Sequence, residues 1–234
     1  MAGRLPEERG EKPVTRQWWG ALTFLHWALG PAAVQALLPD GVEVDTWDGA
    51  AWVSMTPFVM TLRVGPLPRV PGMSTFPETN LRTYVRGPDG RDGLWFLSLE
   101  ADSLPLVIGA STLYGVPYRW ADMSVGVGTT VRYRSRRRVG RPAGHDITVR
   151  VGPPCDEVTE LDHWLSGRWR AWTRVAGRYC TVPVEHPPWS LHEASVVGLE
   201  ETLFAAAGLT RPAAPPLVRY SVGVDAHRGR PHAV

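Results

Sequence analysis

Four polar side chains of different chemistry occupy every second position in one short segment. A carboxyl, an amide, a guanidinium and a phenol stand at Glu78, Asn80, Arg82 and Tyr84. Because side chains alternate faces along a strand, an extended segment over 79–86 places all four on one face. That face is either solvated or the polar lining of a pocket. In a partly apolar pocket the pKa of Glu78 would rise, and its carboxyl would act as a general acid or base.

Two interpretations of the charged pair in this segment stay open. In the first, Arg82 clamps a ligand carboxylate or stabilises an enolate beside Glu78. In the second, Glu78 and Arg82 form a salt bridge that only holds the strand, since structural ion pairs also perturb pKa values.

The histidines leave similar alternatives. His186 follows an expected strand and is either a pocket base or the cap of a loop. His26 lies in an apolar segment, where we expect a core histidine, although it is kept among the binding candidates. The chain has no His-x-His motif, no His-Glu-x-x-His motif and no carboxylate cluster, so we expect no metal. The Gly126–Gly128 segment joins two strands and lacks the third glycine of a nucleotide loop, so we expect no cofactor.

The elements that must position these residues are mostly strands. Hydrophobic periodicity and turn signals predict about ten strands. They also predict four helices, over 31–38, 103–114, 156–166 and 193–207. The regular alternation of strand and helix that builds a parallel sheet is missing. We therefore expect a mostly β (α+β) fold, an antiparallel barrel-like sheet with flanking helices and a small-ligand cavity.

Composition limits the organisation of the chain and its partners. With 44% hydrophobic residues and 21% charged residues, the 234-residue chain is expected to be globular. We predict a flexible arm over 1–16, one domain over 17–226, a tail over 227–234, and a loop over 65–72. A net charge of +2 indicates no nucleic-acid partner. Residues 17–39 hold no charge, but polar residues interrupt them, so we expect a buried strand and helix and no membrane span. We expect a cytoplasmic protein, and homo-oligomer formation stays open.

Several motifs together resemble one bacterial family. They are His26-Trp27, Asp48-Gly49-x-Ala51-Trp52, Phe76-Pro77-Glu78-x-Asn80-x-Arg82-Thr83-Tyr84-Val85, His186-Pro187-Pro188-Trp189 and Arg219-Tyr220-Ser221-x-Gly223-Val224. This set is similar to the YqjF-like or DUF2071 family, from about Gln17 to Asp225. The family is grouped with the acetoacetate decarboxylase-like superfamily, whose fold is a β-barrel-like sheet around a small cavity.

The resemblance implies where a site would lie and limits its chemistry. Gly115-Val116-Pro117-Tyr118-Arg119 is similar to the decarboxylase segment that contains the Schiff-base lysine. Tyr118 stands where that lysine would be, and the sole lysine of the chain is Lys12, so imine chemistry is not transferable. We expect Glu78, Tyr118 and Arg119 to be catalytic. The expected binding residues are His26, Asn80, Arg82, Tyr84, Trp120, His186 and Tyr220.

Two functions of different class follow. The first is a lyase or isomerase that performs acid–base chemistry next to a carbonyl of a small metabolite. The second is a protein that binds an apolar or carboxylated metabolite without changing it. The sequence does not discriminate between them.

Overall fold

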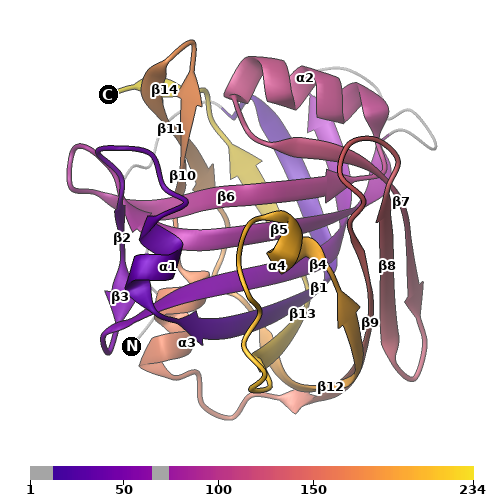
Figure 1. Cartoon of the computed structure of the whole chain (residues 1–234). Helices are drawn as coiled ribbons and strands as arrows, with labels where there is room; N and C mark the ends of the chain where they lie inside the picture. The colour runs from indigo at the N-terminus through magenta and orange to yellow at the C-terminus, as the bar shows by residue number, and fades with distance from the viewer. Residues whose placement is uncertain (1–12, 65–73) are drawn as a thin grey trace.

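The computed structural model describes residues 13–64 and 74–234 (Figure 1). In these ranges the first half of the chain forms β1 Thr15–Leu29, α1 Pro31–Gln35, β2 Glu43–Val44, β3 Thr46–Trp47, β4 Ala50–Val64, β5 Thr75–Arg86, β6 Asp92–Ala101 and α2 Leu104–Tyr114. The second half forms β7 Tyr118–Val127, β8 Val131–Arg137, β9 Gly144–Pro154, α3 Glu160–Ser166, β10 Arg170–Val175, β11 Arg178–Glu185, β12 Leu191–Glu201, α4 Leu203–Ala206, β13 Leu217–Arg228 and β14 His232–Ala233.

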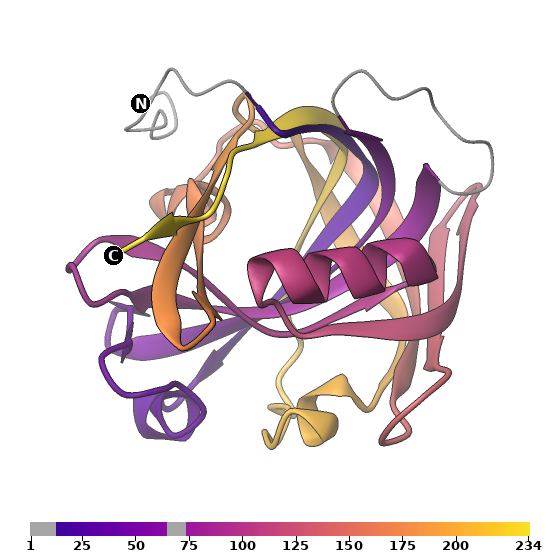
Figure 2. The ribbon, with the colours of Figure 1, turned by 90° about the horizontal axis from the view of Figure 1, so that it is seen from above.

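The sheet formed by the described strands closes on itself along two circuits. The larger circuit runs β6-β7-β8-β9-β12-β13-β1-β4-β5, and pairing of β5 with β6 closes it. The smaller circuit runs β6-β10-β11-β13-β1-β4-β5, and pairing of β11 with β13 completes it. Figure 2 shows this ring of strands from above, with α2 along one side. The predicted barrel-like, mostly β fold is confirmed, and the pairings of β6 with β7 and with β10 are parallel.

The two circuits share the wall β13-β1-β4-β5-β6, and each wall strand contributes to two cores. On β5, Phe76 packs in a cluster with Phe24 and Phe58. Leu81, at an odd position of the same strand, packs in a separate cluster with Tyr133. This division follows from the alternation of side chains along a strand. The even positions of β5 therefore face the smaller circuit, which decides where Glu78 points.

A bulge in β1 accommodates the proline of β4. Gly20 pairs with Val59 and Leu25 pairs with Met55, so β1 has one residue more than β4 in this interval. Ala21 has a φ of +46°, in the left-handed region that one class of β-bulge uses. Pro57 has no N–H to donate, so it fits inside this wall because the ladder to β1 is already interrupted beside it.

The connection from β6 to β7 is a crossover through α2, as the parallel pairing of these strands requires. The predicted helix over 103–114 is confirmed. Pro105 lies in its first turn, and Gly115 ends it in the left-handed conformation with a φ of +63°.

Substitution of Gly115 by alanine is expected to destabilise the fold by at least about 1–2 kcal/mol, because a left-handed backbone disfavours a Cβ. That Cβ would also lie 2.1 Å from the carbonyl oxygen of Arg174. Gly109→Ala is the matched control within α2, since nothing lies within 4 Å of its Cβ position. We expect Gly109→Ala to raise the free energy of unfolding, by up to about 1 kcal/mol. Urea denaturation of both variants measures the difference, and equal losses would contradict this explanation.

The helix predicted over 193–207 is wrong. Residues Leu191–Glu201 form β12, which pairs with β9, and only Leu203–Ala206 are helical. The register between β12 and β9 shifts between Val196 and Gly198. This irregularity lets Val196 and Leu199 both pack against the core, while Val197 is exposed. A spacing of three apolar positions thus arises from a bulged strand and resembles helical periodicity.

Smaller differences concern the other helices and the chain ends. Helix α3 begins at Glu160, later than the predicted start at 156, because Thr159 and Asp162 form a capping box there. Residues 1–12 of the predicted arm and the loop predicted over 65–72 lie outside the described residues. Thr15 and Arg16 belong to β1, and β13 and β14 extend into the segment predicted as a tail over 227–234. Among the described helices, none has the length and apolarity needed to cross a bilayer.

Candidate functional site

A cavity of about 100 Å³ lies inside the smaller circuit, beneath α2. Its lining side chains come from β1, β4, β5, β6, β7, β10, β11, β13, α2 and α3, and from the segments that connect them. Most of them are apolar, and the large aromatic ones include Trp19, Phe24, Phe58 and Trp189. A few polar groups point into the same space, a combination typical of small-molecule sites.

Glu78 is the acidic side chain of this cavity. It is 2% exposed, and the hydroxyl of Tyr118 donates to its Oε2 at 3.2 Å. Burial raises the pKa of Glu78 from 4.5 to about 7, while hydrogen bonds from Tyr118 and Asn80 and the charge of Arg228 oppose that rise. A carboxyl with a pKa near neutrality can both release and accept a proton at physiological pH.

Tyr118 reaches Glu78 from a strand two places away in the sheet. The parallel pairing sets Leu99 of β6 opposite Tyr118, and Asn80 of β5 pairs with the same Leu99. Burial, together with the neighbouring Glu78, raises the pKa of Tyr118 well above its ordinary value. The phenol therefore stays protonated and serves as a hydrogen-bond donor.

Substitution of Tyr118 by phenylalanine is expected to raise the pKa of Glu78 above its value in the unsubstituted protein. The reason is that the Tyr118 hydroxyl stabilises the ionised carboxylate, which loses that hydrogen bond in the variant. Difference infrared spectroscopy of the carboxyl group across a pH series measures this change. Tyr179→Phe, with a hydroxyl that donates to the carbonyl of Asp40, is the control and should leave the pKa of Glu78 unchanged. An unchanged or lower pKa in Tyr118→Phe would contradict the assignment.

Four arginines line the cavity, and among the described residues only two of them form ion pairs with carboxylates. Arg168 contacts Asp45 at 2.9 Å and Asp92 at 2.8 Å, and Arg170 contacts Asp92 at 3.2 Å. Arg82 and Arg228 both lie on the same cavity. Among the described residues, neither of these two has a carboxylate within 4.0 Å.

The alternative in which Glu78 and Arg82 form a salt bridge is therefore wrong. The two side chains point into the same cavity without pairing. Burial lowers the pKa of Arg82 and the neighbouring Tyr84 opposes that change, and the Arg82 guanidinium lies 5.8 Å from the ring centre of Phe24. Arg228 instead stacks over Tyr114, at 4.0 Å from the ring centre.

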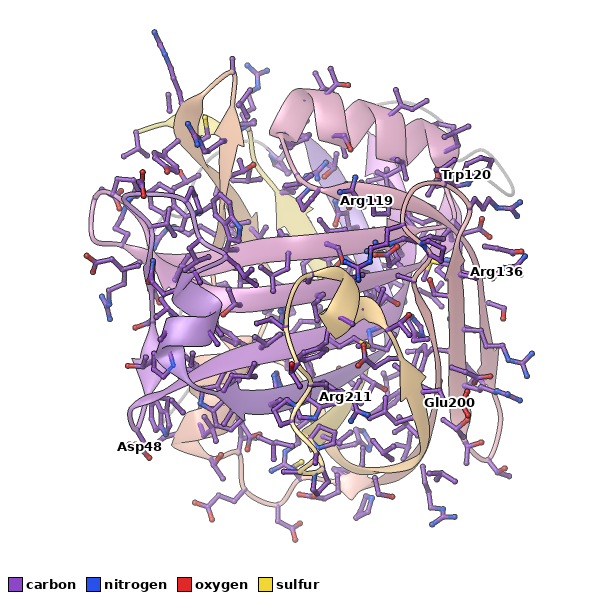
Figure 3. The ribbon with its side chains drawn as sticks, in the orientation of Figure 1. Asp48, Arg119, Trp120, Arg136, Glu200 and Arg211 are labelled. Atoms are coloured by element: carbon purple, nitrogen blue, oxygen red, sulfur yellow. The ribbon has the colours of Figure 1, made fainter. Side chains whose placement is uncertain are left out.

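The expectation that Arg119 lies beside Glu78 and Tyr118 is wrong. Tyr118 points into the cavity, and on strand β7 the next side chain must point to the other face. Arg119 is exposed and does not line the cavity. Trp120 also lies outside the cavity lining, where the Arg138 guanidinium stacks 5.0 Å from its ring centre. Figure 3 shows Arg119 and Trp120 on β7.

Two other predicted binding residues form a buried network. The Nδ1 of His26 lies 2.6 Å from Ser54 Oγ, and that oxygen lies 2.7 Å from the hydroxyl of Tyr84. Tyr84 also donates to the carbonyl of Leu165 at 2.9 Å. Burial, with the charge of Arg82 adding to it, lowers the pKa of His26 well below its ordinary value. His26 and Tyr84 are not among the residues that line the cavity.

The remaining predicted positions divide between the two cores. Asn80 lines the cavity, and so does His186, whose Nδ1–H donates to the carbonyl of Pro187 at 2.7 Å. Burial lowers the pKa of His186 to about 4, so its imidazole is neutral near pH 7. His186 thus makes a loop contact and also lines the pocket, while its action as a base stays a prediction. Tyr220 packs in the other core, so its placement in the site is wrong.

Sequence reasoning missed Arg228, Arg168 and the tryptophans of the cavity. Arg228 lies at the end of β13, inside the segment predicted as a tail, and no local pattern points to it. Trp189 is the last residue of the His-Pro-Pro-Trp motif, which was the one available signal for the aromatic side of the site. Across residues 13–64 and 74–234, no three His, Cys, Asp or Glu side chains are grouped so that they could hold a metal ion.

Comparison of the sequence with known proteins identifies a family and a relative. The family model DUF2071, described as an uncharacterized conserved protein, matches residues 16–225. The uncharacterized protein YqjF of Bacillus subtilis is 38% identical over 216 residues, which cover 91% of this chain and 89% of YqjF.

The similar solved structures include three enzymes of one fold. An acetoacetate decarboxylase-like enzyme of Sphingomonas wittichii has a TM-score of 0.66 at 16% identity, covering 100% of this chain and 99% of the other. The enduracididine biosynthesis enzyme MppR, in complex with pyruvate, has a TM-score of 0.65 at 16% identity, covering 97% and 93%. The acetoacetate decarboxylase of Legionella pneumophila has a TM-score of 0.64 at 16% identity, covering 95% and 87%. The fold is therefore of the acetoacetate decarboxylase-like type.

Proposed function

The chain belongs to the DUF2071 family, and from that premise we propose that it is a small-molecule enzyme, a lyase or isomerase, which transfers protons beside a carbonyl group. The single observation that supports this most strongly is the contact between Glu78 and Tyr118 inside an apolar cavity. A buried carboxyl with a pKa of about 7 is not needed to hold a barrel together, and it lowers stability when ionised. Such groups are typical of proton-transfer sites.

The residues divide the work of such a reaction in a definite way. The Glu78 carboxylate removes a proton from the carbon next to a substrate carbonyl, and the electron pair of that C–H bond moves to form an enolate. The positive charge of Arg228 and the hydroxyl of Tyr118 stabilise the negative oxygen. The protonated Glu78 then returns its proton to carbon or to a leaving group, which restores the starting state.

The aromatic lining and the arginines favour small carbonyl acids as substrates. MppR, which shares the fold, is described in complexes with pyruvate and with the condensation product of pyruvate and imidazole 4-carboxaldehyde. Among the described residues that line the cavity, none is a lysine that could form an imine, and the one lysine of the chain, Lys12, lies outside the described residues. The proposed mechanism therefore needs acid–base chemistry alone.

Deuterium exchange tests the proposal without knowledge of the full reaction. The protein is incubated in heavy water with a panel of small 2-oxo and 3-oxo acids, and proton NMR follows the signal of the hydrogens next to each carbonyl. We expect faster exchange for at least one compound with the unsubstituted protein, and none above background with Glu78→Gln. Recovery of every compound without exchange or conversion would refute the enzyme and favour a protein that binds a metabolite unchanged.

A further inference from the structure

We propose that the natural ligand of the cavity is an aromatic carboxylate, held with its carboxylate on Arg82 and its ring against the aromatic wall formed by Trp19, Phe24 and Trp189. For the chemistry at Glu78 this inference rests on the proposed function, since it names the class of molecule on which that site acts. Three separate observations support it: the unmatched charge of Arg82, the unpartnered polar atoms around the cavity, and the arrangement of the aromatic rings.

The first observation is the charge balance. Asp45 and Asp92 neutralise Arg168 and Arg170, but Arg82 has no carboxylate partner among the described residues. Removing a guanidinium from water without an opposite charge costs free energy, and burial accordingly lowers the pKa of Arg82. The other charged group near it, Arg168, is also positive. An anion bound beside Arg82 would supply the missing partner.

The second observation is a set of buried polar atoms that have no hydrogen-bond partner and belong to residues that line the cavity. They are Thr56 Oγ1, Asn80 Oδ1, Arg82 Nε, Arg168 Nη2 and Arg228 Nε. Three of the five are guanidinium nitrogens, which can only donate. A carboxylate can only accept, through two oxygens, and it matches the fork of an arginine side chain. This excess of donors favours an anionic ligand over a neutral one.

The third observation is the shape of the apolar side of the cavity. Trp19 and Trp189 are stacked, with ring centres 6.1 Å apart and planes at 19°. Phe24 meets Trp189 edge-on at 5.0 Å, and the same Phe24 lies next to the Arg82 guanidinium. A flat ring that packs on these surfaces would gain offset or edge-on contacts with them. Because Phe24 touches both groups, the ring and the carboxylate of one small molecule can reach the wall and Arg82 together.

The same molecule also meets the proposed acid–base pair. Glu78 and Arg82 project from one face of β5, and their backbone positions are about 13 Å apart at the usual rise of a strand. The two side chains extend into the cavity from both ends of this interval, so a ligand held at Arg82 lies within the reach of Glu78. Asn80, between them, offers its unpartnered Oδ1 to a donor on the ligand.

Isothermal titration calorimetry with three compounds separates the two ends of the ligand. Phenylpyruvate has both the ring and the carboxylate, pyruvate lacks the ring, and phenylacetone lacks the carboxylate. The proteins are the unsubstituted chain, Arg82→Gln, and the control Arg136→Gln, since Arg136 is an exposed arginine of β8. The buffer is kept below the pKa of Glu78 so that its carboxyl is neutral.

We expect phenylpyruvate to bind the unsubstituted protein at least tenfold more tightly than either fragment. Arg82→Gln should weaken the binding of phenylpyruvate by about tenfold to a hundredfold, the usual loss when a charge-assisted hydrogen-bonded pair is removed. Arg136→Gln should leave the affinity for phenylpyruvate unchanged. Equal binding of phenylacetone and phenylpyruvate would overturn the carboxylate anchor. Equal binding of pyruvate and phenylpyruvate, or no binding of phenylpyruvate, would overturn the aromatic class.

The three-compound comparison on the unsubstituted protein decides the proposal even if Arg82→Gln fails to fold. Failure of the proposed ligand class can also be distinguished from failure of the proposed function. Binding at Arg82 without deuterium exchange would refute the chemistry and leave the ligand class standing. Deuterium exchange that depends on Glu78, together with equal affinity for all three compounds, would support the chemistry and refute the ligand class.

Discussion

Glu78→Gln is expected to lower turnover by about a hundredfold to ten-thousandfold while the fold stays intact, which is the usual contribution of a general acid–base group. Glutamine keeps the shape of the side chain and can still contact Tyr118, but it cannot exchange a proton. The rate of deuterium exchange next to the substrate carbonyl measures this loss. Glu43→Gln, at an exposed position of β2, is the control and should retain the full rate.

The same substitution is expected to stabilise the protein at high pH. The folded-state pKa of Glu78 is about 7, and its ordinary value is 4.5. Below the lower value the carboxyl is neutral in both states and burial carries no charge penalty. As pH rises through this interval the unfolded chain loses its proton first, so stability falls and reaches its lower plateau above pH 7. At 1.36 kcal/mol for each pKa unit, the penalty is about 3 kcal/mol.

Denaturant unfolding at two pH values checks this expectation. Glu78→Gln should gain stability over the unsubstituted protein above pH 7, and the gain should shrink as pH approaches 4.5. Circular dichroism establishes that both proteins are folded at each pH. A variant that loses both stability and exchange in proportion would mean that Glu78 is a structural residue, and the proposed chemistry would then fail.

Arg168→Leu is expected to lower the free energy of unfolding by about 3–5 kcal/mol, the usual cost of removing one member of a buried ion-pair network. Arg168 is 5% exposed, and its Nη1 contacts both Asp45 and Asp92. Its guanidinium also lies 4.3 Å from the ring centre of Trp164. Removal of the arginine therefore takes one of two cationic partners from each carboxylate, leaving Asp45 with Arg86 at 3.3 Å and Asp92 with Arg170 at 3.2 Å.

Arg134→Leu is the matched control for this substitution. Arg134 pairs with Asp146 at 3.2 Å on the outer face of β8, where solvent screens the charges. Exposed pairs of this kind contribute at most about 1 kcal/mol. Urea unfolding compares the two variants at one pH. Similar small losses for both would show that the Asp45–Arg168–Asp92 contacts contribute little to stability.

The sequence predicted the parts of the fold that depend on local rules. Gly115 ends α2, and the alternation along β5 places Glu78, Asn80 and Arg82 on one cavity, because glycine conformation and strand geometry act over a few residues. The helix over 193–207 failed because its spacing came from a bulge between β9 and β12. A bulge depends on a partner strand that is distant in sequence, so periodicity alone does not distinguish the two.

The candidate site was predictable only in part, for a similar reason. Tyr118 was placed correctly in the cavity, but Arg119 was placed with it although adjacent residues of a strand face opposite sides. Arg228 reaches the cavity because β13 pairs with β11 and β1, and no local sequence pattern predicts these pairings. Long-range closure of the sheet, rather than any single motif, decides which arginines meet Glu78.

Direct titration of the Glu78 side chain tests the central claim most closely. Carbon NMR of protein labelled at the glutamate carboxyls, with Glu78→Gln used to assign the signal, gives the midpoint without any knowledge of the substrate. A buried acid–base group beside Tyr118 should titrate near pH 7. A midpoint near the ordinary 4.5 would show that Glu78 is solvated, and the proton-transfer site would then be refuted.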